Sequence, residues 1–133
     1  MMRLDDWQDR FFAYLEATRL LPFAWGMNDC CLFAAGSIDS ITGSTLVTQL
    51  RAIYSDEPSA LAYIASFGSL EAAVTSWLGT SKAPNSAGPG DIVLADLELG
   101  PTIGVCMGVN CAFSASQGMI YGDRSIISVC WTV

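Results

Sequence analysis

The hydrophobic residues of this chain recur with a helical period in its first part and with a strand period in its last part. The apolar residues of 4–15 are spaced as on one face of a helix, and Pro22 marks the end of that helix. A second helix is predicted over 30–42, because Asp29 stands where an N-cap belongs and Gly43 where a helix commonly ends. Three shorter helices are expected at 46–53, from Pro58 to Gly68, and from 70 to Gly79.

Beyond a polar connector over 80–90, the period changes to two, which is typical of β-strands. Gly108 and Val109 predict a tight hairpin turn between two of these strands. Helices followed by a run of antiparallel strands predict an α+β fold. The chain is interpreted as one domain over 1–133, mainly helical over 1–79 and forming a sheet over 91–133. Strands are expected at 91–96, 102–107, 110–115, 119–121 and 126–132.

The composition predicts that a partner covers part of the surface. Charged residues make up only 14% of the chain, against about 25% in an average globular protein. The alternative is a compact domain that is unusually rich in core residues. The net charge of −7 and the six scattered Lys and Arg residues exclude binding to nucleic acid or to an anionic membrane surface.

No membrane span and no signal peptide are expected. The most apolar stretch, 92–116, is interrupted by Asp96, Glu98 and Pro101, and residues 1–20 contain no continuous hydrophobic block. An odd number of cysteines without a secretory signal predicts free thiols in a reducing compartment. The five cysteines are Cys30, Cys31, Cys106, Cys111 and Cys130.

Cys30 is the candidate nucleophile, because the positive end of a helix dipole favours a thiolate. Such a thiol normally needs an imidazole to take its proton, and the chain contains no histidine. Asp29 is a sequence neighbour whose expected task is to cap the helix, and its charge would raise the pKa of the thiol. A buried, inert cysteine is therefore the favoured interpretation of Cys30.

Three segments, taken in order, resemble the NlpC-type cell-wall peptidases of the papain-like superfamily. They are Pro-Phe-Ala-Trp-Gly over 22–26 with the pair Asp29-Cys30, Pro-Gly-Asp over 89–91, and Thr-Ile-Gly-Val-Cys-Met-Gly over 102–108. The resemblance implies a papain-like fold, with the helix that begins at Cys30 packed on an antiparallel sheet. It places Cys30 at the nucleophile, Thr102 where the family has its histidine base, and Ser114 where a residue orients that base. A threonine hydroxyl cannot replace the imidazole.

The resemblance is greatest to a branch encoded by tailed phages. It implies a catalytically inactive component of the tail tip, made in the host cytoplasm and carried in the virion. Its expected partners are hub or distal tail proteins, with peptidoglycan as a further candidate, and no cofactor is expected. The alternative is an active peptidase or amidase on peptidoglycan stem peptides, which uses Cys30 with an unconventional base or a histidine lent by a partner.

A second alternative is a thiolate metal or iron–sulfur site. Cys106 and Cys111 are expected to face each other across the hairpin, and Cys106 shares a strand face with Thr102. If that face points at the helix of Cys30, these cysteines converge with Cys130 from a later strand. No Cys-x-x-Cys spacing supports this site.

Overall fold

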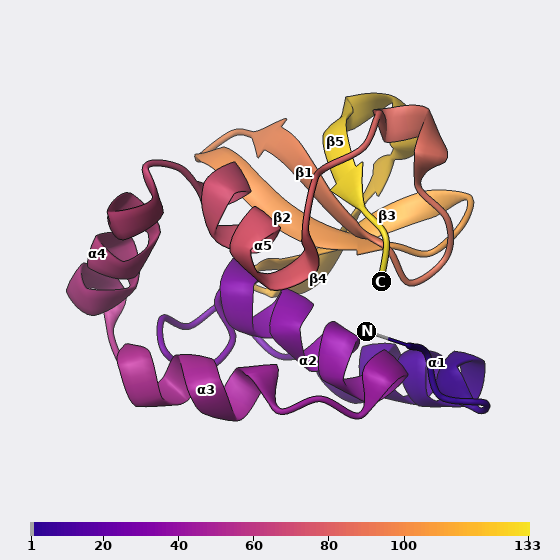
Figure 1. Cartoon of the computed structure of the whole chain (residues 1–133), viewed down its shortest axis with the longest axis horizontal. Coiled ribbons are helices and arrows are strands. Elements are labelled where there is room, and N and C mark those ends of the chain that lie inside the picture. Colours follow the sequence, from indigo (N-terminus) through magenta and orange to yellow (C-terminus); the bar gives the residue numbers. More distant parts are fainter. Residues whose placement is uncertain (1) are drawn as a thin grey trace.

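The computed structural model describes residues 2–133, in which a group of helices packs against one sheet (Figure 1). Within these residues the chain forms five α-helices and then five strands, so the predicted α+β class with an antiparallel sheet is confirmed. The helices are α1 (Trp7–Thr18), α2 (Cys30–Thr42), α3 (Leu46–Ile53), α4 (Glu57–Phe67) and α5 (Leu70–Leu78). The strands are β1 (Ile92–Leu97), β2 (Gly100–Cys106), β3 (Asn110–Ala115), β4 (Gly118–Asp123) and β5 (Ile127–Trp131). Short 3-10 helices η1 (Pro84–Ser86) and η2 (Arg124–Ile126) precede β1 and β5.

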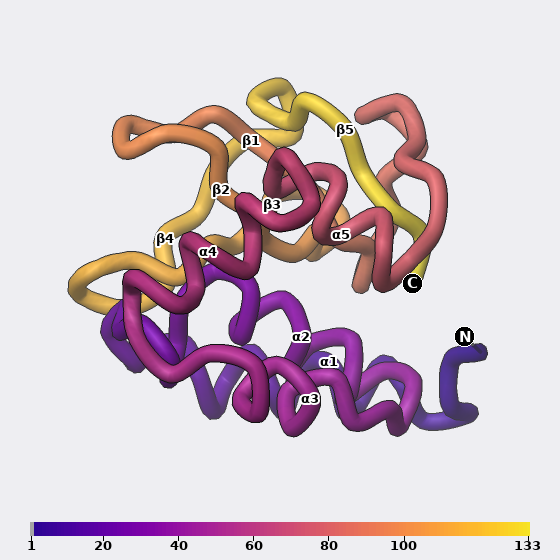
Figure 2. The backbone as a smooth tube through the Cα atoms, turned by 60° about the vertical axis from the view of Figure 1, so that its left-hand side comes forward, coloured from indigo at the N-terminus to yellow at the C-terminus, as the bar shows by residue number. Residues whose placement is uncertain are grey.

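The central helix α2 has the predicted bounds because both of its ends are fixed by local chemistry. The Asp29 carboxylate accepts a hydrogen bond from the Leu32 N–H at 2.9 Å, and Gly43 adopts the left-handed conformation with φ 73°. Every residue from Asn28 to Ile38 is buried, because α1 and α3 pack on one side of α2 and β2 and β3 on the other. Figure 2 shows the helices α1 to α3 together below the sheet.

The first helix is shorter than predicted at both ends. Leu4 lies before α1, where its N–H donates to the Ile41 carbonyl at 2.8 Å. At the other end α1 stops at Thr18, and the segment that follows bonds to the β3–β4 hairpin: the Met119 N–H donates to the Arg19 carbonyl at 2.8 Å. Pro22 therefore lies beyond the end of the helix. No helix in residues 2–133 has the length and apolar character needed to cross a membrane.

The sheet has the order β4-β3-β2-β1-β5, and side chains on both of its faces are buried. Ile92, Ile103 and Val105 belong to the large cluster that they share with the helices, which marks the first face. Val93 and Phe113 belong to a smaller cluster on the second face. Because neighbouring residues of a strand point to opposite faces, β1, β2, β3 and β5 each contribute to both clusters, whereas β4 contributes only Met119, which packs against the first.

The two edge strands, β4 and β5, are consecutive in the sequence, so the chain must pass from one edge of the sheet to the other. The short helix η2 lies in this connection and brings Arg124 to the hairpin between β2 and β3, where its guanidinium donates to the Gly108 carbonyl at 2.9 Å. The 80–90 connector also reaches this region, through a bridge between Lys82 and Cys130 and through the buried Ala87. Together these segments cover the second face of the sheet.

Arg3 joins the first and last described segments of the chain, which lie close together in Figure 1. Its guanidinium donates to the Val133 carbonyl at 2.6 Å and to the Pro89 carbonyl at 3.0 Å, and it pairs with Asp91 at 2.9 Å. The same group lies 4.1 Å from the centre of the Trp7 ring. Asp91 also accepts hydrogen bonds from the backbone N–H groups of Gly88 and Val133, and so closes the turn into β1.

Candidate functional site

Cys30 is the first residue of α2, and its side chain points into the core between the helix and the sheet. Only 8% of its surface is exposed, and its neighbour Cys31 is 2% exposed. The backbone of Ile103 in β2 is close enough to interact with the Cys30 thiol. The predicted nucleophile therefore lies at a helix N-terminus and is buried.

The buried carboxylate of Asp29 organises this end of the helix. One of its oxygens accepts hydrogen bonds from the Leu32 N–H at 2.9 Å and from the Tyr54 hydroxyl at 2.8 Å. The other accepts a hydrogen bond from the Gly26 N–H at 3.0 Å. Burial is the largest of the effects that raise the pKa of Tyr54. The hydroxyl therefore stays protonated and acts as the donor of the hydrogen bond to the carboxylate. The expected cap is confirmed, and Asp29 in addition ties the loop before α2 to the end of α3.

The electrostatics around Cys30 provide no group to take its proton. Contact with the Cys31 thiol lowers the pKa of Cys30, while burial and the charge of Asp29 oppose that change. The same contact, together with burial, raises the pKa of Cys31. Among residues 2–133, no cationic side chain acts on either thiol, and the Asp29 carboxylate is occupied by its three donors. This arrangement provides hydrogen bonding within the core and lacks the base that nucleophilic catalysis requires.

The structure contradicts the expectation that the strand face of Thr102 and Cys106 points at the helix of Cys30. Ile103 and Val105 occupy that face, and their neighbours in β2 point to the opposite one. The Thr102 hydroxyl donates to the Gly100 carbonyl at 3.1 Å, within its own strand. The residue at the position of the family's base is therefore separated from Cys30 by the thickness of the sheet.

Ser114 does lie on the same face as Cys30, but it is bonded to Asn28. Its hydroxyl donates to the Asn28 carbonyl at 2.9 Å, and the Asn28 amide donates back to that hydroxyl at 3.1 Å. The amide also donates to the carbonyls of Leu21 and Pro22. Both Ser114 and Asn28 are buried, so the pair connects β3 to the loop before α2. No imidazole or other base remains for Ser114 to orient.

Replacing Ser114 with alanine should lower the free energy of unfolding by about 1–2 kcal/mol, because the buried Asn28 amide and carbonyl each lose a partner. Urea denaturation measures this change. The matched control is Ser37→Ala in α2, whose buried hydroxyl has no hydrogen-bond partner within residues 2–133. That substitution should be neutral or stabilising. Equal effects of the two substitutions would contradict a stabilising role for the Ser114–Asn28 pair.

The proposed set of metal ligands does not converge. Cys106, Cys111 and Cys130 belong to the cluster on the second face of the sheet, whereas Cys30 belongs to the cluster shared with the helices. Within residues 2–133, no three Cys, His, Asp or Glu side chains are placed to hold a metal ion. All five cysteines are free and buried. The expected pairing of Cys106 with Cys111 across the hairpin is confirmed.

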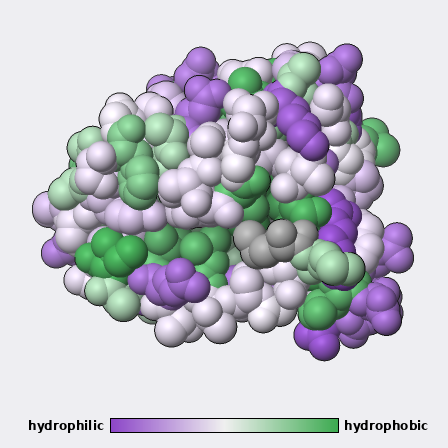
Figure 3. All heavy atoms as spheres, in the orientation of Figure 1, coloured by the Kyte–Doolittle hydropathy of each residue, from purple (hydrophilic) through white to green (hydrophobic). Residues whose placement is uncertain are grey.

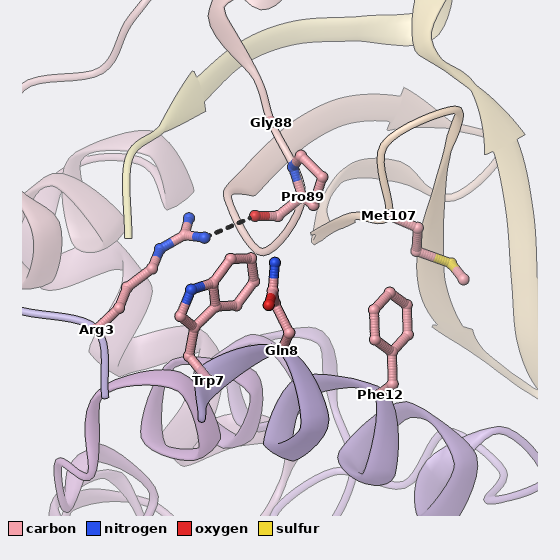
Figure 4. Close-up of a pocket in the computed structure, with 7 residues that line it drawn as sticks. All are labelled: Arg3, Trp7, Gln8, Phe12, Gly88, Pro89 and Met107. Carbon is pink, nitrogen blue, oxygen red and sulfur yellow. Dashed lines mark hydrogen bonds between the residues drawn. The ribbon is translucent and has the colours of Figure 1, made fainter. Parts of the chain in front are cut away.

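A surface hollow of about 450 Å³ lies elsewhere, between α1, the 88–89 turn and the β2–β3 hairpin (Figure 4). Its walls are mainly apolar, and its one charged group, the Arg3 guanidinium, already pairs with Asp91. It contains no cysteine and no carboxylate, so it offers neither a nucleophile nor a base. Its lining residues are Arg3, Trp7, Gln8, Phe12, Gly88, Pro89 and Met107.

Sequence reasoning missed three polar contacts that shape these regions: Tyr54 with Asp29, Arg3 with Asp91, and Arg124 with Cys106. Each joins residues far apart in the sequence, and no local motif marks them. Only the contact with Asp29 had a signal in the sequence. A buried carboxylate at the start of a helix needs several hydrogen-bond donors, so further donors to Asp29 were to be expected.

Comparison with known proteins gives a family and no function. Residues 2–133 match the family model DUF6950, described as a domain of unknown function. No curated protein matches the chain.

Proposed function

The chain belongs to the DUF6950 family, and we propose that it is a non-catalytic, NlpC-like component of a tailed-phage tail tip that binds neighbouring tail proteins. One observation carries this proposal: Cys30 is buried at the start of α2 with no base within reach. In the NlpC-type peptidases, two further positions hold the base and the residue that orients it. Here Thr102 stands at the first and lies on the far face of the sheet, and Ser114 stands at the second and is bonded to Asn28.

The arrangement of the three segments that resemble the NlpC-type peptidases supports the papain-like part of the proposal. The helix that begins at Cys30 packs on the antiparallel strands β2 and β3, as in a papain-like domain. The Pro-Gly-Asp turn over 89–91 leads directly into β1, and the buried Asp91 holds the turn closed. The scaffold is thus suited to a Cys-centred site, while the groups needed for proton transfer are replaced by groups that stabilise the fold.

The surface supports a role in binding other proteins. Figure 3 shows hydrophobic side chains on the visible face around α3 at the left and around α1 at the lower right. Only 14% of the chain is charged, and the described residues expose large apolar side chains at several positions. They include Phe12, Leu20 and Leu21 on and after α1, Met27 in the loop before α2, Ile53 on α3, and Leu61 and Phe67 on α4.

Co-expression with the hub and distal tail proteins of the same phage tests the proposal. We expect a complex with at least one of these proteins that survives size-exclusion chromatography, because burial of the exposed apolar surface favours association. A chain that elutes as a monomer in the presence of every tail-tip protein would contradict the proposed role.

The activity measurement uses purified muropeptides with the isolated chain and with any complex obtained. We expect no cleavage by the wild-type chain, because Cys30 lacks a base. Cleavage that is lost in Cys30→Ala but kept in Cys31→Ala would overturn the non-catalytic assignment and establish the peptidase alternative. Activity seen only in the complex would point to a histidine supplied by the partner.

A further inference from the structure

The second face of the sheet carries two thiols placed for mutual reaction. Cys106 is the last residue of β2, and Cys111 lies directly opposite it in β3. The Cys106 N–H donates to the Asp91 carbonyl, and the Cys106 carbonyl accepts from the Gly90 N–H, both at 2.8 Å. Because the backbone of Cys106 bonds toward β1, its pairing with Cys111 is of the non-hydrogen-bonded type. In such pairs the Cα atoms are about 4.5 Å apart, which is within the range that a disulfide spans.

Hydrogen-bond donors surround the sulfur of Cys106. The Arg124 Nη1 lies 3.3 Å from this sulfur, and the Gly108 N–H donates to it at 3.4 Å. Arg124 is held in place by its bond to the Gly108 carbonyl. Contact with the Cys111 thiol, then the Gly108 N–H and Arg124, lowers the pKa of Cys106 to about 6, against the opposing effects of burial and Asp91. Contact with Cys106 and burial raise the pKa of Cys111, so Cys106 is the thiol of the pair that loses its proton first.

We propose that Cys106 and Cys111 form an oxidation site at which a small hydroperoxide converts the two thiols into a disulfide. This inference is independent of the proposed function. The Cys106 thiolate attacks one peroxide oxygen, the O–O bond breaks, and the leaving oxygen takes up a proton. The products are a Cys106 sulfenic acid and water or an alcohol. The Cys111 sulfur then attacks the Cys106 sulfur, the S–O bond breaks, and the hydroxyl leaves as water with the proton of Cys111.

The Arg124 side chain and the turn between β2 and β3 separate the two thiols from solvent. Both thiols are buried, but Arg124 is only half-buried and the adjoining turn carries Val109, which is 91% exposed. Oxidation of the pair therefore requires a displacement of the Arg124 side chain that admits a molecule the size of hydrogen peroxide. The remaining titratable groups around the pair are Asp91 before β1, Asp123 at the end of β4 and Cys130 in β5.

The other three thiols are expected to react more slowly. Cys30 and Cys31 begin α2 and are buried in the main core, where no cationic side chain of residues 2–133 acts on their thiols. Cys130 donates its thiol proton to the Ala83 carbonyl at 3.2 Å, and burial raises its pKa. Since the thiolate is the reactive species, we expect Cys106 to be oxidised about tenfold faster than the other thiols, or more.

Brief exposure of the folded full chain to hydrogen peroxide, followed by alkylation and peptide mapping, tests the proposal. We expect the tryptic peptide 83–124, which contains both residues, to lose two hydrogens before the peptide with Cys30 and Cys31 is modified. Cleavage after Met107 should give fragments that separate only on reduction. A folded chain in which Cys106 and Cys111 stay reduced, or in which Cys106 pairs with Cys130, would overturn the proposal.

Three variants assign the roles. Cys111→Ser should accumulate a sulfenic acid at Cys106 that dimedone traps, whereas Cys106→Ser should leave Cys111 reduced. Arg124→Gln should raise the pH of half-maximal alkylation of Cys106 by roughly one unit, with Arg124→Lys falling between it and the wild type. An unchanged pH profile in Arg124→Gln would show that Arg124 only supports the turn. If a cysteine variant fails to fold, the wild-type mapping still decides whether the disulfide forms.

Discussion

Replacing Gly26 with alanine should destabilise the chain by about 4 kcal/mol and lower its melting temperature by roughly 10 °C or more. A Cβ at this position would lie 2.5 Å from the carbonyl carbon of Ser55 and closer still to its oxygen. These are backbone atoms between α3 and α4, so no side-chain rotation relieves the clash. Gly26 also has φ 79°, a conformation that is strained for any residue with a Cβ. Thermal and urea denaturation measure the effect.

The matched control for this substitution is Gly68→Ala. Gly68 also has a positive φ, of 95°, but a Cβ there would meet no atom within 4 Å. Its replacement should cost about 1–2 kcal/mol, which is the strain of the backbone alone. The difference between the two variants therefore isolates the close approach of Gly26 to Ser55. Equal losses of stability would contradict that approach.

Replacing Asp29 with alanine should cost about 3–5 kcal/mol of unfolding free energy, because three donors lose their acceptor at once. The Tyr54 hydroxyl and the Gly26 and Leu32 N–H groups would remain beneath the surface without partners. The helix cap itself accounts for about 1 kcal/mol of the loss. Urea denaturation followed by circular dichroism gives the change directly.

Two milder variants separate the contributions to this site. Tyr54→Phe removes one of the three hydrogen bonds and should cost about 1 kcal/mol. Asp29→Asn keeps one oxygen acceptor and should fall between Tyr54→Phe and Asp29→Ala. If the free energy of unfolding of Asp29→Ala were equal to or higher than that of Tyr54→Phe, water would be replacing the carboxylate. The site would then be open to solvent.

The features predicted correctly from the sequence are those fixed by nearby residues. The bounds of α2 follow from Asp29 and Gly43, which act within one helical turn of its ends. The hairpin at Gly108 and the pairing of Cys106 with Cys111 follow from turn chemistry, since a short turn sets the register of the strands beside it.

The features that were missed depend on contacts between distant parts of the chain. The period of two predicts that Thr102 and Cys106 share a face, but it does not tell which face meets the helices. Both faces of β2 are apolar, because the second face has its own cluster under the β4–β5 connection, so hydrophobicity could not decide. The donors to Asp29 from Tyr54 and to the Cys106 sulfur from Arg124 depend on the same tertiary arrangement.

The burial of α2 from Cys30 to Ile38 has a consequence for the order of folding during synthesis. This part of the helix is apolar apart from Ser37, yet the strands β2 and β3 that cover it follow only after α5 and the 80–90 connector. While the ribosome makes the intervening segments, the helix has nothing but α1 and its immediate neighbours to pack against. The nascent chain therefore exposes the hydrophobic segment 28–38 until the β2–β3 hairpin emerges from the ribosome. We expect a chaperone to bind this segment first.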